Sequence, residues 1–230
     1  MTGVKARRLK ALLFDKDGTL VDFAITWNGA AASVLATLAG EDDALHGRLA
    51  DILHFDRETR AIRSSSPFIG GTIVDIAAEF APMIGIASDD AFVRRLEQLF
   101  NAGALASVAP IGDPASLLTL LKAEGYLLGI VTNDTESGAR AQAEKLGLDH
   151  LFDAVIGYDS GHGRKPDPGQ IHAFLDAFAI APGEAALIGD TLHDLDAARA
   201  AGVLAVGVAS GHLSAEALAP HADHVIGSIM

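Results

Sequence analysis

The chain has 230 residues and a formal net charge of −13, from 17 basic and 30 acidic side chains. Such an acidic protein is a poor binder of nucleic acid or of an anionic membrane surface, because both would repel it. Half of the residues are hydrophobic and the mean hydropathy is +0.30, which excludes an intrinsically disordered chain. No cysteine is present, and this excludes disulfides, zinc fingers, iron–sulfur clusters and thiol catalysis.

The amino terminus predicts neither an export signal nor a membrane segment. Basic residues precede the apolar run at residues 11–14, but Asp15 ends that run too early for a signal sequence. No apolar stretch approaches the length of a membrane span. We therefore expect a soluble cytoplasmic protein, a monomer or a homodimer, that binds neither nucleic acid nor membranes.

Short apolar runs recur along the chain and predict buried strands. They cover residues 9–15, 127–133, 153–158, 185–190 and 203–209. Runs of this kind, without polar alternation, are typical of parallel strands that are buried on both faces.

Helices with recognisable ends are predicted between several of these runs. Each starts at a capping residue and stops at a glycine, and the three helices cover residues 113–125, 135–147 and 191–202. This alternation of strands and helices predicts an α/β doubly wound fold around a parallel sheet.

Residues 22–107 differ from the rest of the chain because they lack buried-strand runs. Four segments of this part carry helix-compatible spacing: residues 30–38, 45–62, 73–80 and 91–105. We therefore expect a helical domain at residues 22–107, inserted into an α/β core that is formed by residues 1–21 and 108–230.

Two features of this helical domain bear on a substrate. Arg57, Arg60 and Arg63 recur every three residues and would share one helix face. That face is either a solvated basic surface, which we favour, or a receptor for a substrate carboxylate. Residues 64–71 form a loop, and its part from Phe68 to Gly71 is either an ordinary helix connector or a mobile specificity loop that dips toward the site. Trp27 is expected to pack inside the domain.

Polar side chains follow the predicted strands where each strand ends. They are Asp15, Asp17, Thr132, Asn133, Lys165, Asp190 and Asp194. Because the carboxyl ends of parallel strands meet at one edge of a sheet, we expect these groups to lie together. Four carboxylates at one point would repel one another, and a hard divalent cation such as Mg²⁺ removes that repulsion. The lysine, the threonine hydroxyl and the N–H groups around Gly18 would complete a receptor for a phosphoryl group.

The spacing of Asp15 and Asp17 has a physical reason. Side chains two residues apart leave an extended chain on the same side, and Gly18 permits the tight bend that follows. One carboxylate is then free to attack phosphorus while the second handles protons.

These residues resemble the four motifs of the haloacid dehalogenase superfamily of phosphatases. The motifs are FDKDGTLVD, VTN, the lysine of GRKPDP, and GDTLHD. Their order and separations fit, and the helical insert lies where that superfamily places its helical cap. The stretch SGHGRKPDPG and the general layout most resemble phosphoglycolate phosphatase-like members. The resemblance implies a magnesium-dependent phosphomonoester hydrolase that acts on a small phosphorylated metabolite, with phosphoglycolate among the candidates.

The resemblance also implies catalytic roles. Asp15 would be the nucleophile and form an aspartyl-phosphate. Asp17 would protonate the leaving alcohol and then activate water. Thr132 and Lys165 would hold the phosphoryl oxygens, and Asn133 would touch the phosphate beside them.

The Mg²⁺ ligands implied by the resemblance are Asp15, the backbone carbonyl of Asp17 and Asp190. Asp194 would support the ion directly or through water. Asp17 also argues for phosphorus chemistry, since the dehalogenases of the superfamily, which attack carbon, lack an acid at this position.

Several neighbouring residues have less specific interpretations. Lys16 departs from the apolar residue that the superfamily usually has there; it either contacts substrate or, as we favour, pairs with an acidic neighbour. His162 lies close to Lys165 in sequence and would line the site, whereas His193 is expected to face along its helix. Three aspartates near predicted helix starts are interpreted as capping residues: Asp113, Asp134 and Asp167.

Three other functions stay open at this point. A sugar-phosphate phosphomutase would use the same core but return the phosphoryl group to a sugar. A 2-haloacid dehalogenase is disfavoured by Asp17. A non-catalytic phospho-ligand sensor would bind its ligand without turnover.

Overall fold

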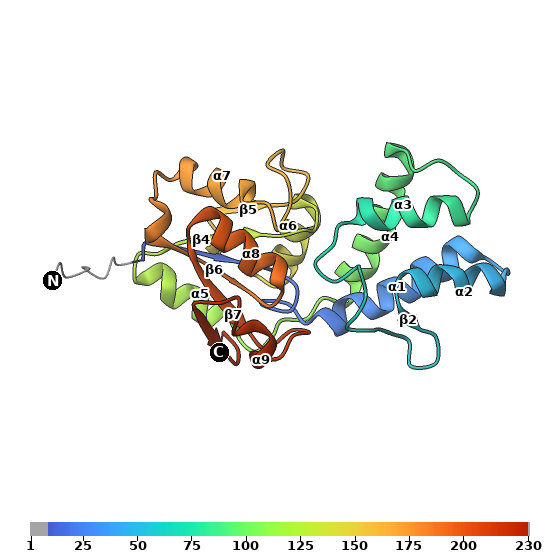
Figure 1. Ribbon diagram of the computed structural model, residues 1–230, viewed down its shortest axis with the longest axis horizontal. Coiled ribbons are helices and arrows are strands. Elements are labelled where there is room, and N and C mark those ends of the chain that lie inside the picture. Colours follow the sequence, from blue (N-terminus) through green and yellow to red (C-terminus); the bar gives the residue numbers. More distant parts are fainter. Residues whose placement is uncertain (1–8, 230) are drawn as a thin grey trace.

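The computed structural model describes residues 9–229, which form two lobes (Figure 1). The sheet lobe comprises residues 9–22 and 108–229, and the helical lobe comprises residues 23–107. All strands of the main sheet are parallel, in the order β5-β4-β1-β6-β7-β8. The strands are β1 (Ala11–Phe14), β4 (Leu127–Val131), β5 (Ala154–Ile156), β6 (Ala185–Gly189), β7 (Leu204–Val208) and β8 (His224–Ile226). The α/β fold and all five predicted strands are confirmed, and β8 is an additional edge strand.

Helices cover both faces of this sheet. They are α5 (Pro114–Ala123), α6 (Glu136–Lys145), α7 (Gly169–Ala177), α8 (Leu192–Ala201) and the short α9 (Ala215–Leu218), with 3₁₀ turns η1 (Asp149–Leu151) and η2 (Pro182–Glu184). Successive residues of a strand point to opposite faces. Leu13 of β1 accordingly packs in the hydrophobic cluster with α7 and α8, whereas Phe14 packs in the cluster with α5 and α6.

The helix ends follow the predicted capping chemistry at most positions. The Asp113 carboxylate accepts a hydrogen bond from the backbone N–H of the third residue of α5 at 3.1 Å, and Thr135 caps α6 in the same way at 3.0 Å. The interpretation of Asp134 and Asp167 as caps is wrong. Thr135 occupies the capping position before α6, and α7 begins after Pro168, whose ring offers no hydrogen-bonding group.

The helical lobe has a hydrophobic cluster of its own, separate from the two clusters on the sheet. Its elements are α1 (Phe23–Ala39), α2 (Asp43–Ile52), β2 (Phe55–Asp56), β3 (Ala61–Ile62), α3 (Ile73–Met83) and α4 (Asp90–Ser107). Leu35, Phe80 and Leu96 are fully buried at its centre. None of the helices within residues 9–229 is long and apolar enough to cross a membrane.

The expectation of helix-compatible structure over residues 45–62 is wrong beyond α2. The helix ends at Ile52, and an antiparallel pair of short strands follows. The carboxylate of Asp56 accepts hydrogen bonds from two backbone N–H groups of the turn, both at 3.0 Å, which favours a turn over a helix. His54 and Arg60 adopt φ values of 47° and 55°, which are incompatible with a right-handed helix.

The three arginines of this segment therefore do not share a helix face. Arg57 pairs with Asp43, and Arg63 pairs with Asp56 at 2.9 Å. All three arginine side chains are exposed, and none lines the cavity between the lobes. The structure thus removes the residues that were candidates for binding a substrate carboxylate.

Gly129 tests how tightly the sheet packs against α7. A Cβ atom at this position would lie 2.6 Å from the ring of Phe174 and 2.8 Å from Leu13. We expect Gly129→Ala to lower the free energy of unfolding in urea by about 1–3 kcal/mol. Gly29→Ala is the matched control, because that exposed position on α1 has open space, and there we expect a gain of about 1 kcal/mol. An unchanged stability of Gly129→Ala would contradict the packing described.

Candidate active site

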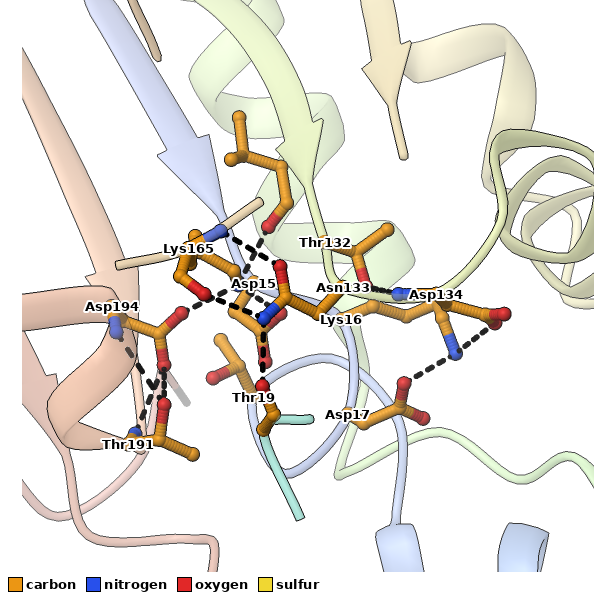
Figure 2. A network of polar contacts seen from close by, with 12 residues as sticks. Asp15, Lys16, Asp17, Thr19, Thr132, Asn133, Asp134, Lys165, Thr191 and Asp194 are labelled. Carbon is orange, nitrogen blue, oxygen red and sulfur yellow. Dashed lines mark hydrogen bonds and ion pairs between the residues drawn. The ribbon is translucent and has the colours of Figure 1, made fainter. Parts of the chain in front are cut away.

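The predicted polar residues gather at the carboxyl edge of the sheet (Figure 2). Asp15 follows β1, Asp190 follows β6, and Asp194 lies in the first turn of α8. Lys165 reaches the same place from the loop between β5 and α7. The side chains of Asp17, Thr132 and Asn133 line the cavity that opens beside this cluster.

The ammonium group of Lys165 lies at the centre of the cluster and contacts two of its carboxylates. It donates hydrogen bonds to Asp15 Oδ1 at 2.6 Å, to Asp194 Oδ1 at 2.5 Å and to the carbonyl oxygen of Val131 at 2.9 Å. These contacts use all three of its N–H donors. Burial lowers the pKa of Lys165, but the two carboxylates more than offset this, so its pKa is raised and the side chain is charged.

Asn133 fixes the loop that carries Lys165. Its Oδ1 accepts from the backbone N–H of Lys165 at 2.9 Å, and its Nδ2 donates to the backbone carbonyl of the same residue at 2.9 Å. The second Nδ2 hydrogen goes to the carbonyl of Gly70 in the helical lobe at 2.7 Å. With every amide group engaged, Asn133 positions the lysine loop in this structure.

Asp15, Asp190 and Asp194 place carboxylate oxygens within 4.8 Å of one another, and all three residues are buried. Burial raises the pKa of Asp15 to about 7. The attraction of Lys165 opposes this rise, and repulsion from Asp194 and Asp17 adds to it. Burial and the charges of Asp15 and Asp194 raise the pKa of Asp190 well above its ordinary value. One ammonium therefore does not balance the negative charge of the cluster.

Asp190 offers the clearest place for a cation. Its Oδ1 accepts from the hydroxyl of Thr19 at 3.2 Å, but its buried Oδ2 has no hydrogen-bond partner among the described residues. The backbones of Gly18 and Gly211 pass so close that a Cβ atom would lie 2.3 and 1.8 Å from this oxygen. A buried, unpaired carboxylate oxygen is costly, and a divalent cation with oxygen ligands fits it.

Asp194 differs from the other two carboxylates because both of its oxygens are already paired. Its Oδ2 accepts from the backbone N–H and the hydroxyl of Thr191, at 3.0 and 2.7 Å, in a capping box at the start of α8. Its Oδ1 holds Lys165. Asp194 thus links the start of α8 to the ammonium of Lys165.

A second network surrounds Asp17. The indole N–H of Trp27 donates to Asp17 Oδ1 at 2.6 Å, and the ammonium of Lys16 lies 2.6 Å from Asp17 Oδ2. Lys16 also reaches Asp134 Oδ2 at 3.2 Å and Gln142 Oε1 at 2.8 Å, with only 2% of its side chain exposed. The predicted pairing of Lys16 with acidic neighbours is confirmed. Burial raises the pKa of Asp134, and Lys16 opposes that rise.

Several supporting residues were not found from the sequence. Trp27 packs in the helical lobe as expected, but it also bonds to Asp17 across the lobes. Gln170 donates to the carbonyl of Thr132 at 2.9 Å, and Ser210 donates to the carbonyl of Gly18 at 2.8 Å. No local pattern marks these residues, since each contact joins different structural elements and depends on how those elements pack.

Thr132 presents a hydroxyl that is available to a ligand. Its Oγ1 accepts from the backbone N–H of Asp134 at 3.1 Å, so its own hydrogen is free to donate into the cavity. His193, at the start of α8, also lines the cavity. His162 is exposed and does not line it. Residues 68–71 line the cavity too, which supports the interpretation of this loop as part of the site.

Comparisons with known proteins agree with this geometry. A model of the haloacid dehalogenase-like hydrolase family matches residues 12–208. The phosphoglycolate phosphatase of Rhodospirillum rubrum is 32% identical over 208 residues, which span 88% of this chain and 80% of that protein. A haloacid dehalogenase-like hydrolase from Streptococcus pneumoniae superposes with a TM-score of 0.73 at 24% identity, covering 96% of this chain and 95% of that chain. The β-phosphoglucomutase of Clostridium difficile gives 0.69 at 19% identity, covering 96% and 92%.

The parallel sheet, the carboxylate cluster at its edge and the family match together indicate a hydrolase with an α/β core. The chain belongs to the haloacid dehalogenase-like hydrolase family. The family match and the curated relative confirm the expectation of a phosphatase of this family. The two structural matches establish the fold.

Lys16 provides a test of the buried charge network. Lys16→Met would leave the buried carboxylate of Asp134 without its cation, so we expect the free energy of unfolding to fall by about 3–5 kcal/mol. Lys122→Met is the matched control, because Lys122 pairs with Asp153 at a more exposed position, where such a pair contributes about 0–1 kcal/mol. Equal losses for the two variants in urea unfolding would contradict the network.

Proposed function

We propose that this protein is a magnesium-dependent phosphomonoester hydrolase that works through an aspartyl-phosphate on Asp15. The observation that carries the proposal is the buried Asp15 carboxylate beside the cavity, 2.6 Å from the ammonium of Lys165 and flanked by Asp190 and Asp194. This arrangement supports a nucleophile at Asp15 and a cation bound by the neighbouring carboxylate oxygens.

In the first step, a carboxylate oxygen of Asp15 attacks phosphorus and the bond from phosphorus to the ester oxygen breaks. Asp17 donates a proton to the departing alkoxide, which leaves as the alcohol. Trp27 and Lys16 hold the Asp17 side chain for this transfer. The free hydroxyl hydrogen of Thr132 bonds to a phosphoryl oxygen.

In the second step, water attacks phosphorus of the aspartyl-phosphate. Asp17, now a carboxylate, accepts a proton from that water. The bond between phosphorus and the Asp15 oxygen breaks, which restores the carboxylate and releases inorganic phosphate.

Lys165 has no spare donor before substrate binds, because its three hydrogens contact Asp15, Asp194 and Val131. It can reach a phosphoryl oxygen only by giving up one of these contacts. We assign the exchange to the Asp15 contact, since phosphorylation removes negative charge from that oxygen. Asp194 and the Val131 carbonyl then keep the ammonium in place.

The donor set fits a hard divalent cation, and we propose Mg²⁺. The ion would be held by Asp15, Asp190 and the backbone carbonyl of Asp17. Asp194 would act indirectly, through its hydrogen bond with Lys165. When bound, the ion supplies positive charge beside the oxygens of the transferring phosphoryl group.

The helical lobe is proposed to act as the cap over a small phosphorylated metabolite. The relative in Rhodospirillum rubrum is named a phosphoglycolate phosphatase, which makes phosphoglycolate one candidate substrate. A phosphomutase is the alternative on the same fold, and a β-phosphoglucomutase is among the structural matches. Isomerisation of a sugar phosphate without phosphate release would favour that alternative.

Asp15→Asn tests the nucleophile. An amide is a poor nucleophile, so we expect phosphate release to fall by at least about 10³-fold, while the melting temperature shows that the fold survives. Asp176→Asn, on the exposed surface of α7, is the control and should keep full activity. Turnover near the wild-type rate, also seen in Asp15→Ala so that deamidation is excluded, would refute the assignment.

Asp190→Asn tests the cation site without an activity readout. Millimolar Mg²⁺ should raise the melting temperature of the wild type by several degrees, because a ligand of the native state stabilises it. The rise should vanish in Asp190→Asn and persist in Asp176→Asn. An equal rise in all three proteins would place the ion elsewhere.

A further inference from the structure

The wall of the cavity that faces the carboxylate cluster is aromatic. Phe23, Trp27, Phe68 and Phe100 line it from the helical lobe. Phe68 stacks on Phe100 with ring centroids 4.9 Å apart and packs edge-on against Trp27 at 5.3 Å. It is half-buried, whereas the other three rings are buried. A group bound against these rings is in contact with carbon rather than with water.

The charged group in this wall is an acid. Glu97, on α4, lines the cavity and accepts a hydrogen bond from the hydroxyl of Tyr158 on the sheet lobe. Burial and Glu97 raise the pKa of Tyr158, so its hydroxyl keeps the proton that it donates. The amide of Asn101 donates to Thr135 at 3.2 Å.

No positively charged side chain lines this wall among the described residues. The ammonium of Lys16 lies 5.2 Å from the centroid of the Trp27 ring, but it does not line the cavity and is paired with Asp17 and Asp134. No lysine or arginine of the helical lobe reaches it. Arg164, from the sheet lobe, is bonded to Thr72 and Asp75 and does not line the cavity either. Lys165 is committed to the carboxylate cluster.

Two histidines also line the cavity, both from the sheet lobe. His212 packs edge-on against Phe23 with ring centroids 4.6 Å apart, and burial lowers its pKa, which favours the neutral ring. His193 lies beside Gly70 on the loop that carries Phe68. Neither ring lies in the wall formed by the helical lobe.

From this arrangement we infer that the substrate is the phosphomonoester of an alcohol that bears no negative charge. The apolar part of this alcohol contacts the aromatic wall, and any polar end is a hydrogen-bond donor directed toward Glu97. The inference rests on the proposed phosphatase function and names its substrate class. A carboxylate on the leaving group would be desolvated against the rings and repelled by Glu97, and no cation in this wall would compensate. An ammonium would instead be attracted by Glu97 and by the aromatic faces.

Three primary alkyl esters of similar size test the inference. In phosphoglycolate the carbon that bears the ester oxygen carries a carboxylate, in isobutyl phosphate it carries an isopropyl group of similar shape, and in phosphoethanolamine it carries an aminomethyl group. We expect kcat/KM for phosphate release, measured with the full chain and Mg²⁺, to be at least tenfold higher for isobutyl phosphate and phosphoethanolamine than for phosphoglycolate.

Two variants assign the preference to the wall. Glu97→Gln still accepts from Tyr158, and it should lower the ratio of kcat/KM for phosphoethanolamine to that for phosphoglycolate by at least tenfold. Phe68→Ala should reduce kcat/KM for isobutyl phosphate more than for phosphoglycolate. Glu144→Gln, at an exposed position on α6, is the control and should change none of these values.

The outcomes separate this inference from the proposed function. If phosphoglycolate is the best of the three esters and Glu97→Gln leaves the ratios unchanged, the substrate class is refuted while the phosphatase stands. If the folded wild type releases phosphate from none of these esters and from none of a broad panel of phosphomonoesters, the proposed function fails, and the inference fails with it.

Discussion

The site depends on an imbalance of buried charge. Three carboxylates converge at the edge of the sheet, and the single ammonium of Lys165 binds two of them. Burial in a medium of low polarity strengthens both the attraction and the repulsion. The fold accepts the excess negative charge because Asn133 and the capping box of Asp194 fix the partners in place. One oxygen of Asp190 has no hydrogen-bond partner among the described residues, and the proposed cation would restore the balance there.

The second network links the chemistry to the helical lobe. Asp17 receives one hydrogen bond from its neighbour Lys16 and one from Trp27, which belongs to the helical lobe. Asp17, the proposed proton-transfer group, is therefore fully held only when α1 lies against the sheet lobe. Asn133, through the Gly70 carbonyl, makes a similar link on the other side of the cavity. The packing of the two lobes and the arrangement of the site thus depend on the same contacts.

Much of the sheet lobe could be predicted because its signals are local. Buried parallel strands read as apolar runs, and caps and glycines mark the ends of α5, α6 and α8. The helix α7 was missed since no side chain caps it, and β8 because it is a short, partly exposed edge strand. In the segment at 45–62, helical periodicity continued through a turn that Asp56 and two left-handed residues impose.

The carboxylates and the lysine of the site could be predicted because parallel strands end at one edge. The contacts of Trp27 with Asp17 and of Glu97 with Tyr158 could not, since they join the two lobes and depend on how these pack. The arginines were misplaced for a local reason, because the turn at Asp56 interrupts the helical periodicity. The sequence thus reveals the groups proposed to react more readily than the residues proposed to select a substrate.

Trapping the covalent intermediate tests whether Asp15 is the nucleophile. The wild-type protein is mixed with Mg²⁺ and a phosphomonoester that it hydrolyses, quenched during the first turnovers and treated with borohydride, which reduces an acyl phosphate to an alcohol. Tandem mass spectrometry then locates the resulting homoserine. The account predicts homoserine at position 15 alone. Homoserine at another aspartate, or none at all while phosphate is being released, would contradict it.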